Sequence, residues 1–247
     1  MRAPVKQASA NSNVSKERDP MNRSADAPAR RRGMLAAILA VFALALAFAA
    51  PASAEFGFTD FDVQFNERDA TPGIPFDDPP ATQAGSHPFA ITTYFGLNYS
   101  EKFPGEILPF APDERAKDLI IEQVAGLSGD ATAIPRCSSA AFAEEGLAGI
   151  GPCDLSTQIG VAALGIGLPE LYFLSPITNL EPPPGAVVRL GFWVLSVPTI
   201  IDVGVKPGGE YNVRAVASRL TSQVIPVLGS VIQLWGVPAD PAHDSVR

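Results

Sequence analysis

A basic cluster followed by an apolar run constrains this chain more than any other feature. Three arginines at 30–32 precede a continuous apolar segment over residues 34–50, and the small residues Pro-Ala-Ser-Ala follow it. A basic flank, an apolar core and an Ala-x-Ala ending make up a secretory signal peptide. The sequence therefore predicts a hydrophobic leader helix over residues 34–54, with cleavage between Ala54 and Glu55.

The same run has a second interpretation as an uncleaved membrane anchor. It contains 17 residues, which is the lower limit for a transmembrane helix. A buried core helix is disfavoured because the run is apolar on every side and follows a basic flank. The small side chains before Glu55 favour cleavage, so we expect contact with a membrane only through a leader that stays uncleaved.

Residues 1–33 are polar and become basic toward their end. Their composition predicts a disordered segment. Met21 begins a short basic stretch, Met-Asn-Arg-Ser, that leads into the arginines. The sequence therefore favours Met21 as the start of the protein, in which case residues 1–20 are not translated.

Removal of the leader makes the rest of the chain strongly acidic. The whole chain has 18 Lys and Arg against 26 Asp and Glu, a net charge of −8. Residues 55–247 hold 10 basic and 23 acidic side chains, a net charge of −13. Such a surface repels phosphate backbones, so we expect no nucleic-acid partner. Its carboxylates would attract divalent cations only weakly.

Proline and glycine punctuate the mature region and favour short strands joined by turns. The chain has 24 prolines and 21 glycines, which interrupt nearly every segment. Residues 55–87 are interpreted as a strand with a bulge near Asp60, followed by a Pro-rich arm. Residues 88–247 are interpreted as one folded domain.

Apolar alternation predicts most of the strands in that domain. The expected strands cover residues 89–99, 117–124, 156–164, 170–180, 187–197, 199–206, 211–220 and 224–235. The turn Lys206-Pro207-Gly208-Gly209 predicts a hairpin from the strands on either side of it. About nine short strands without a βαβ rhythm predict an all-β fold, an antiparallel β-sandwich or jelly-roll.

The two cysteines predict a disulfide. Cys137 and Cys153 are the only cysteines of the chain, and an isolated pair in an exported protein is most simply bonded. The residues between them begin with Ser138, a good N-cap residue, and have the composition of two helical turns. We therefore expect a short helix inside a disulfide loop, stabilised by about 3 kcal/mol through loop closure.

Four segments resemble motifs of one protein family. They are QAGSHPF at 83–89, TAIPRC at 132–137, NLEPPPG at 179–185 and WGVPADPAHD at 235–244. The family consists of large, uncharacterised, exported proteins of high-GC Gram-positive (actinobacterial) bacteria, and the resemblance covers most of residues 55–247. It implies export and a β-rich chain, and it brings no activity and no catalytic residue.

The resemblance also bears on the length of the protein. Members of the family usually continue well beyond the position of Arg247. The domain over 88–247 is therefore expected to be truncated at its C-terminus, as a fragment of a longer protein or as a naturally shortened member.

The sequence predicts no catalytic residue and no cofactor. His87 and His243 are the only histidines, and each lies in a Pro-containing segment. A serine hydrolase would need a sharp nucleophile turn such as Gly-x-Ser-x-Gly, which is absent. Ser86 directly precedes His87, and this adjacency is not the geometry of a nucleophile and its base.

Asp240, His243 and Asp244 form the strongest polar cluster. Their spacing places them on one side of a turn, where the carboxylates could hold Ca²⁺. Addition of His87 would suit a transition metal. A capped turn, in which the two carboxylates bond to backbone amides, is the alternative and is favoured.

A second acidic group has no metal-binding pattern. It lacks the residue order of a calcium loop and is interpreted as solvated carboxylates. Its members are Asp60, Asp62, Asp77 and Asp78.

Two functions fit these features. The favoured one is an exported, non-catalytic module, secreted or on the cell surface, with a structural or interaction role and an unidentified protein or cell-wall glycan as partner. The alternative is a secreted carbohydrate-binding or carbohydrate-active jelly-roll protein. Aromatic residues would then stack on sugars, or Glu170 with Asp202 or Glu210 would form a catalytic carboxylate pair. The aromatic candidates are Trp193, Trp235, Tyr94, Tyr99 and Tyr172.

Overall fold

The computed structural model divides the chain into two units, Met1–Ala54 and Glu55–Arg247. The described residues all belong to the second unit. They are 56–68, 78–83, 85–123, 127, 129–130, 132–144, 152–169, 171–206, 208, 212–220 and 225–247. The predicted leader, its cleavage site and residues 69–77 of the Pro-rich arm lie outside them. In the part of the chain described, no helix is long and apolar enough to span a membrane.

The described residues form an all-β fold, as predicted. The strands are β1 (Phe58–Asn66), β2 (Ala90–Leu97), β3 (Tyr99–Glu101), β4 (Phe110–Pro112), β5 (Asp118–Glu122), β6 (Gln158–Ile166), β7 (Tyr172–Leu180), β8 (Val188–Val194), β9 (Val197–Val205), β10 (Val213–Ser218) and β11 (Val227–Trp235). The helical elements are α2 (Ser139–Glu144), η2 (Leu155–Thr157) and η4 (Pro241–Val246).

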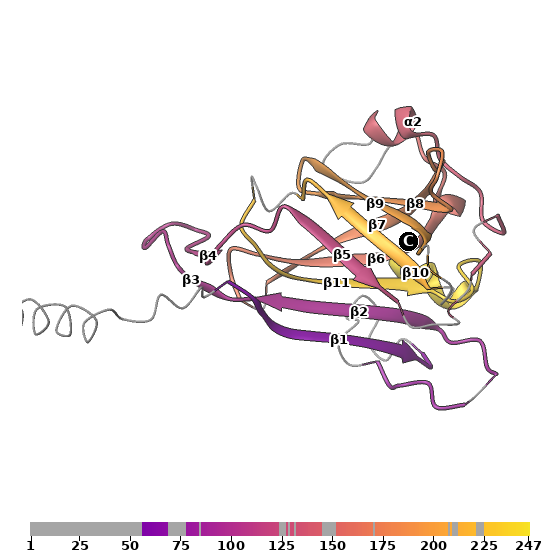
Figure 1. Cartoon of the computed structure of the whole chain (residues 1–247), viewed down its shortest axis with the longest axis horizontal. Coiled ribbons are helices and arrows are strands. Elements are labelled where there is room, and N and C mark those ends of the chain that lie inside the picture. The colour runs from indigo at the N-terminus through magenta and orange to yellow at the C-terminus, as the bar shows by residue number, and fades with distance from the viewer. Residues whose placement is uncertain are drawn as a thin grey trace, which may run out of the picture. The chain divides into compact units, whose positions relative to one another are not determined.

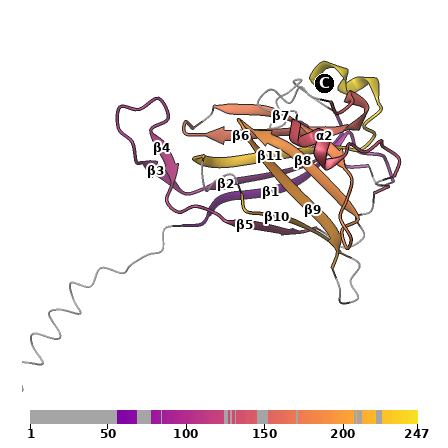
Figure 2. The ribbon, with the colours of Figure 1, turned by 90° about the horizontal axis from the view of Figure 1, so that it is seen from above.

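Nine strands join in a single antiparallel sheet. Their order is β1-β2-β11-β6-β7-β8-β9-β10-β5, while β3 and β4 pair separately. The sheet curls, so that its two halves face each other in the manner of a sandwich (Figures 1 and 2). Residues of β5 and β10 from one end line the same interior as residues of β2 and β11 near the other end. The sandwich-like layering therefore comes from one folded-over sheet.

Several local predictions are confirmed. The register between β1 and β2 shifts between Phe58 and Asp60, where the sequence predicts a bulge. Strands β9 and β10 pair antiparallel as the predicted hairpin. The short strands β3 and β4 were not predicted, because three residues are too few to show a periodic pattern.

Alternating residues of the strands build the core inside the curl. On β6, Ala162, Leu164 and Ile166 are buried, and they pack in one cluster with Leu190 and Phe192 of β8. Successive side chains of a strand point to opposite faces, so every second residue reaches the interior. The strands in the middle of the sheet are also covered on their outer face.

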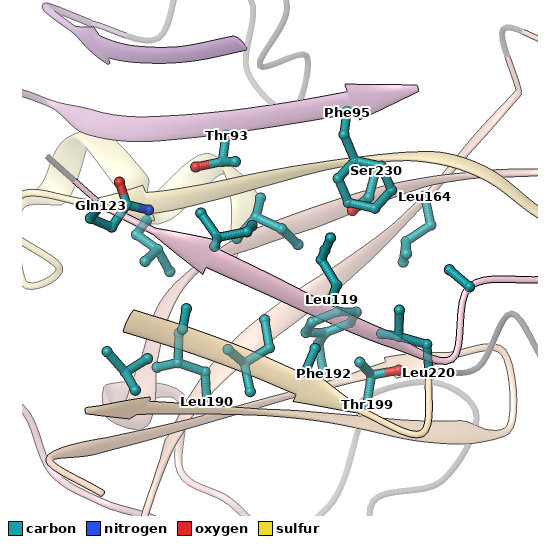
Figure 3. Close-up of a pocket in the computed structure, with 18 of the residues that line it drawn as sticks. Thr93, Phe95, Leu119, Gln123, Leu164, Leu190, Phe192, Thr199, Leu220 and Ser230 are labelled. Atoms are coloured by element: carbon teal, nitrogen blue, oxygen red, sulfur yellow. The ribbon is translucent and has the colours of Figure 1, made fainter. Parts of the chain in front are cut away.

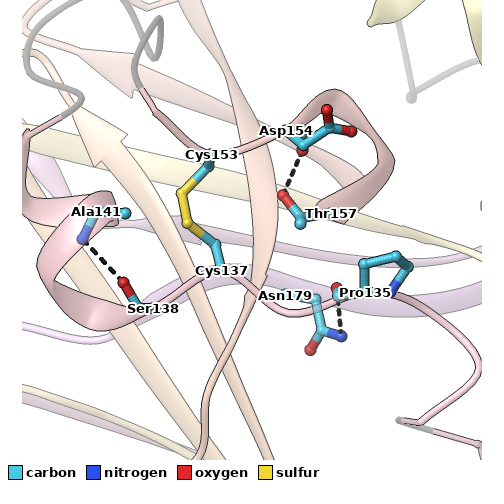
Figure 4. The surroundings of a disulfide bond; sticks show 8 residues. All are labelled: Pro135, Cys137, Ser138, Ala141, Cys153, Asp154, Thr157 and Asn179. Carbon is cyan, nitrogen blue, oxygen red and sulfur yellow. Dashed lines mark hydrogen bonds between the residues drawn. A yellow bond between two sulfur atoms is a disulfide. The ribbon is translucent and has the colours of Figure 1, made fainter.

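The predicted disulfide and its helix cover part of that outer face (Figure 4). Cys137 and Cys153 are bonded, with their Cα atoms 5.5 Å apart, and the loop that they close contains α2. Ser138 caps the helix, since its Oγ accepts a hydrogen bond from the amide of Ala141 at 3.1 Å. Phe142 of α2 is buried with its ring centroid 5.6 Å from that of Trp193. The disulfide and α2 thus cover part of the outer face of β8 at Trp193.

Candidate functional site

The concave face of the sheet surrounds a partly open apolar cavity of about 170 Å³ (Figure 3). Strands β2, β5, β6, β8, β9, β10 and β11 all contribute to its wall. No charged residue is among the described residues that line it. The polar side chains of the lining are Thr93, Gln123, Thr199 and Ser230.

Strand periodicity explains why these side chains meet. Ile91, Thr93, Phe95 and Leu97 occupy every second position of β2, and all four line the cavity. The sequence predicts that they share one face of a strand, and this is confirmed. Figure 3 shows Phe95 pointing across the cavity toward the side chains of β5 and β8, which come from the other half of the curl.

The apolar face continues past the cavity onto the edge strand β1. Phe61 pairs with Phe95 of β2, and Phe65 pairs with Ile91. Residues that are directly opposite in an antiparallel pair lie on the same face, so both rings extend the cavity wall. They are 52% and 37% exposed, respectively. The Phe58 ring also packs edge-on against Phe95, with centroids 5.8 Å apart. An exposed aromatic rim therefore flanks the cavity.

Ser230 is a polar residue in this apolar wall. It is 3% exposed, and its Oγ has no hydrogen-bond partner among the described residues. On its two sides it pairs with Phe95 of β2 and Leu164 of β6, both of which line the cavity. A buried polar group without a partner costs about 1–3 kcal/mol. The Ser230 hydroxyl is therefore able to form a hydrogen bond with a molecule in the cavity.

The predicted metal candidates adopt the geometry of a capped turn. Asp240 caps η4 by accepting a hydrogen bond from the amide of Ala242 at 2.9 Å. Asp244 forms an ion pair with Arg247 at 2.9 Å. In the described segments, no three His, Cys, Asp or Glu side chains converge well enough to hold a metal ion. Binding of Ca²⁺ stays a prediction that this geometry does not favour.

His243 packs against aromatic side chains at the same turn. It is 1% exposed, and its ring stacks on Trp235 at 4.3 Å and lies 4.4 Å from the Phe89 ring. Burial lowers the pKa of His243, against a raising influence of Asp240 and Asp244, while Arg247 lowers this pKa further. The imidazole ring therefore packs between the aromatic rings of Trp235 and Phe89.

The prediction that the second acidic group is solvated is wrong for Asp78. This residue is 6% exposed, and Gln233 Nε2 of β11 donates a hydrogen bond to its carboxylate at 2.8 Å. Asn66 Nδ2 donates to its backbone carbonyl at 3.2 Å. The arm folds back onto the outer face of the sheet at this point. Asp60 and Asp62 are exposed, as expected, whereas residue 77 lies outside the described residues.

The tryptophans of the carbohydrate alternative are not exposed for stacking on sugars, whereas Tyr94 and Tyr172 are partly buried and Tyr99 is 42% exposed. Trp193 and Trp235 are buried beneath Phe142 and His243, so their indole faces are covered. Asp202 binds Arg189 in a two-point ion pair, at 2.7 and 2.9 Å. Both of its neighbours on β9 line the cavity, so its own side chain lies on the opposite face. The positions 170 and 210 lie outside the described residues.

The cavity is the feature of this fold best suited to binding. It is concave and apolar, and it has a few inward polar groups, which is the usual make-up of a ligand site. Comparisons with protein-family models, curated proteins and solved structures found no match to this chain. The chemistry of the lining residues therefore carries the functional interpretation.

Proposed function

We propose that this protein is an exported, non-catalytic binding module that holds an apolar ligand on the concave face of its curled sheet. The observation that carries the proposal is the cavity of about 170 Å³ without a charged residue in its described lining. The exposed aromatic rim of β1 adds apolar surface beside it. Exposed apolar surface of this kind marks interaction sites in soluble proteins.

Protein interiors are close-packed, and voids larger than a water molecule are few. The strands that line the cavity enclose it only in part, so an apolar ligand could enter and bury its surface there. Burial of apolar surface contributes about 25 cal/mol per Å² to binding. A cavity of this kind therefore supports a binding role.

The proposed location is the cell surface or the extracellular space. The predicted signal peptide supports export, as do the resemblance to exported actinobacterial proteins and the Cys137–Cys153 disulfide, since such bonds persist in oxidising compartments. The carbohydrate-binding alternative is not favoured, because both tryptophans that would stack on sugars are buried.

The binding claim can be tested with 4-fluorotoluene, a small apolar probe whose fluorine signal broadens on binding. The protein is expressed as the full chain and purified from the extracytoplasmic fraction, where mass spectrometry should find an N-terminus at Glu55. We expect saturable broadening in the fluorine NMR spectrum. The variant Ala217→Leu places a larger side chain in the cavity wall. It should weaken binding about tenfold, as when roughly 1.4 kcal/mol of apolar contact is blocked.

The matched control is Ala140→Leu, which makes the same change on an exposed position of α2. It should bind the probe like the wild type. Absence of binding to the wild type, or equal weakening by both variants, would contradict the proposal.

A further inference from the structure

We propose that the ligand is a neutral molecule of about the size of one benzene ring that carries one hydroxyl or carbonyl oxygen, and that the hydroxyl of Ser230 recognises this oxygen. This inference rests on the proposed function, because it names the class of molecule that the same cavity takes.

The volume of the cavity sets the size of the ligand. An enclosed apolar cavity of about 150 Å³, lined by Leu, Ile and Phe, binds benzene. The cavity of this protein has a similar volume, about 170 Å³, and a similar lining. One six-membered ring with one substituent fits such a space. A longer molecule would have to extend over the aromatic rim of β1.

The lining sets the charge of the ligand. Among the described residues, no Asp, Glu, Lys, Arg or His lines the cavity. An ionised ligand would lose its hydration there without gaining a partner of opposite charge. The strong net negative charge of the mature chain would in addition repel anions on their approach. A neutral ligand avoids both costs.

Ser230 sets the polar group. The inward positions of β11 are otherwise apolar next to it, with Ile232 and Leu234 following along the strand. Ser230, which is 3% exposed, interrupts that row with a buried hydroxyl that has no partner among the described residues. In Figure 3 it lies beside Phe95 and Leu164, within the wall of the cavity. A serine hydroxyl both donates and accepts, so it can bond a hydroxyl or a carbonyl of the ligand.

The other polar lining residues are less suited to this role. Thr199 already interacts with another group of the protein. Gln123 lies on the far side of the cavity from Ser230 in Figure 3. Of the four polar side chains in the described lining, Thr93 included, Ser230 is the one whose buried polar atom has no hydrogen-bond partner among the described residues.

The test compares two probes of nearly equal size, 4-fluorophenol and 4-fluorotoluene, which differ by a hydroxyl in place of a methyl group. The dissociation constants of both are measured by fluorine NMR titration for the wild type and for Ser230→Ala. The readout is the ratio of the two constants in each protein. We expect the preference for the phenol to fall about fivefold in Ser230→Ala, the effect of one typical hydrogen bond.

The control variant is Ser218→Ala, which removes a hydroxyl from an exposed position of β10. Its ratio should equal that of the wild type. If Ser230→Ala binds both probes with the wild-type ratio, the role of Ser230 is overturned while the proposed apolar site stands. If neither probe binds the wild type, the proposed function fails as well.

Discussion

His243 illustrates how single buried polar residues shape this fold. Its ring fills the space between Trp235 and Phe89, and its Nδ1 has no hydrogen-bond partner among the described residues. Protonation would place a charge in a desolvated site, and this cost outweighs the favourable influence of Asp240 and Asp244 on the charged form. The residue therefore links the stability of the C-terminal turn to pH.

The pH dependence of that link has a definite sign. Burial lowers the pKa of His243 in the folded protein, whereas an unfolded histidine titrates near about 6.5. As the pH falls below that value, the unfolded chain takes up a proton that the folded chain rejects. The free energy of unfolding should therefore fall between about pH 7 and pH 5, with a slope of at most about 1.4 kcal/mol per pH unit from this residue.

The measurement is urea unfolding of the wild type and His243→Phe across this pH range. The variant keeps an aromatic ring between Trp235 and Phe89 but cannot titrate, so its stability should vary less with pH. Ser218→Ala is the control, since it changes an exposed position without a titratable group, and it should leave the pH dependence unchanged. A His243→Phe protein with the same pH profile as the wild type would refute this role.

At the scale of the elements, the close contact between α2 and β8 depends on Gly191, which has no side chain. A Cβ atom added at Gly191 would lie 2.6 Å from Leu180 Cδ1 and 2.7 Å from Phe142 Cζ. These distances are too short for carbon atoms, and both neighbours are buried in the same cluster. The glycine therefore lets the helix of the disulfide loop sit directly on the strand.

Gly191→Ala should destabilise the protein by about 1–3 kcal/mol, the usual cost of overpacking a core. The control is Gly204→Ala on β9, where an added Cβ would lie 3.6 Å from the nearest atom, the carbonyl oxygen of Gly185. Denaturant unfolding of the two variants gives the comparison. Equal stability of both variants would show that the helix does not pack tightly on β8.

The elements also show what the sequence can and cannot predict. The strand over 90–97 and the hairpin of β9 and β10 follow from apolar alternation and from a turn with Pro and Gly, which are local signals. The burial of Asp78 depends on Gln233, 155 residues away. No local pattern reports such a partner, although a polar residue in the middle of an apolar strand indicates that one is needed.

At the scale of the whole molecule, the cavity results from long-range strand order. Strand β11 pairs with β2 on one side and with β6 on the other, so the last strand described lies inside the sheet, third from the β1 edge. The two edge strands are β1 and β5, and their apolar faces turn toward the interior of the curl. No single motif encodes the site, because its wall is assembled from seven strands.

The same order explains why sequence reasoning missed the site. Leu119 of β5 and Leu234 of β11 both line the cavity although they are far apart in the chain. Each belongs to a strand that the sequence predicts. The curl that brings the two strands face to face depends on the order of all nine strands, which alternation does not specify. The local signal that the sequence offers for this site is a serine within an apolar strand, at Ser230.

The most direct test of the central claim is the position of a bound probe. Intermolecular NOEs between 4-fluorotoluene and the methyl groups of the isotope-labelled protein report which face of β11 it touches. Ile232 lines the cavity, while Val231 pairs with Tyr94 and Ala163 and points to the outer face. We predict NOEs to the methyl groups of Ile232 and Leu164 and none to Val231. NOEs confined to Val231 and other outer residues, or no NOE at saturating probe, would contradict a binding site on the concave face.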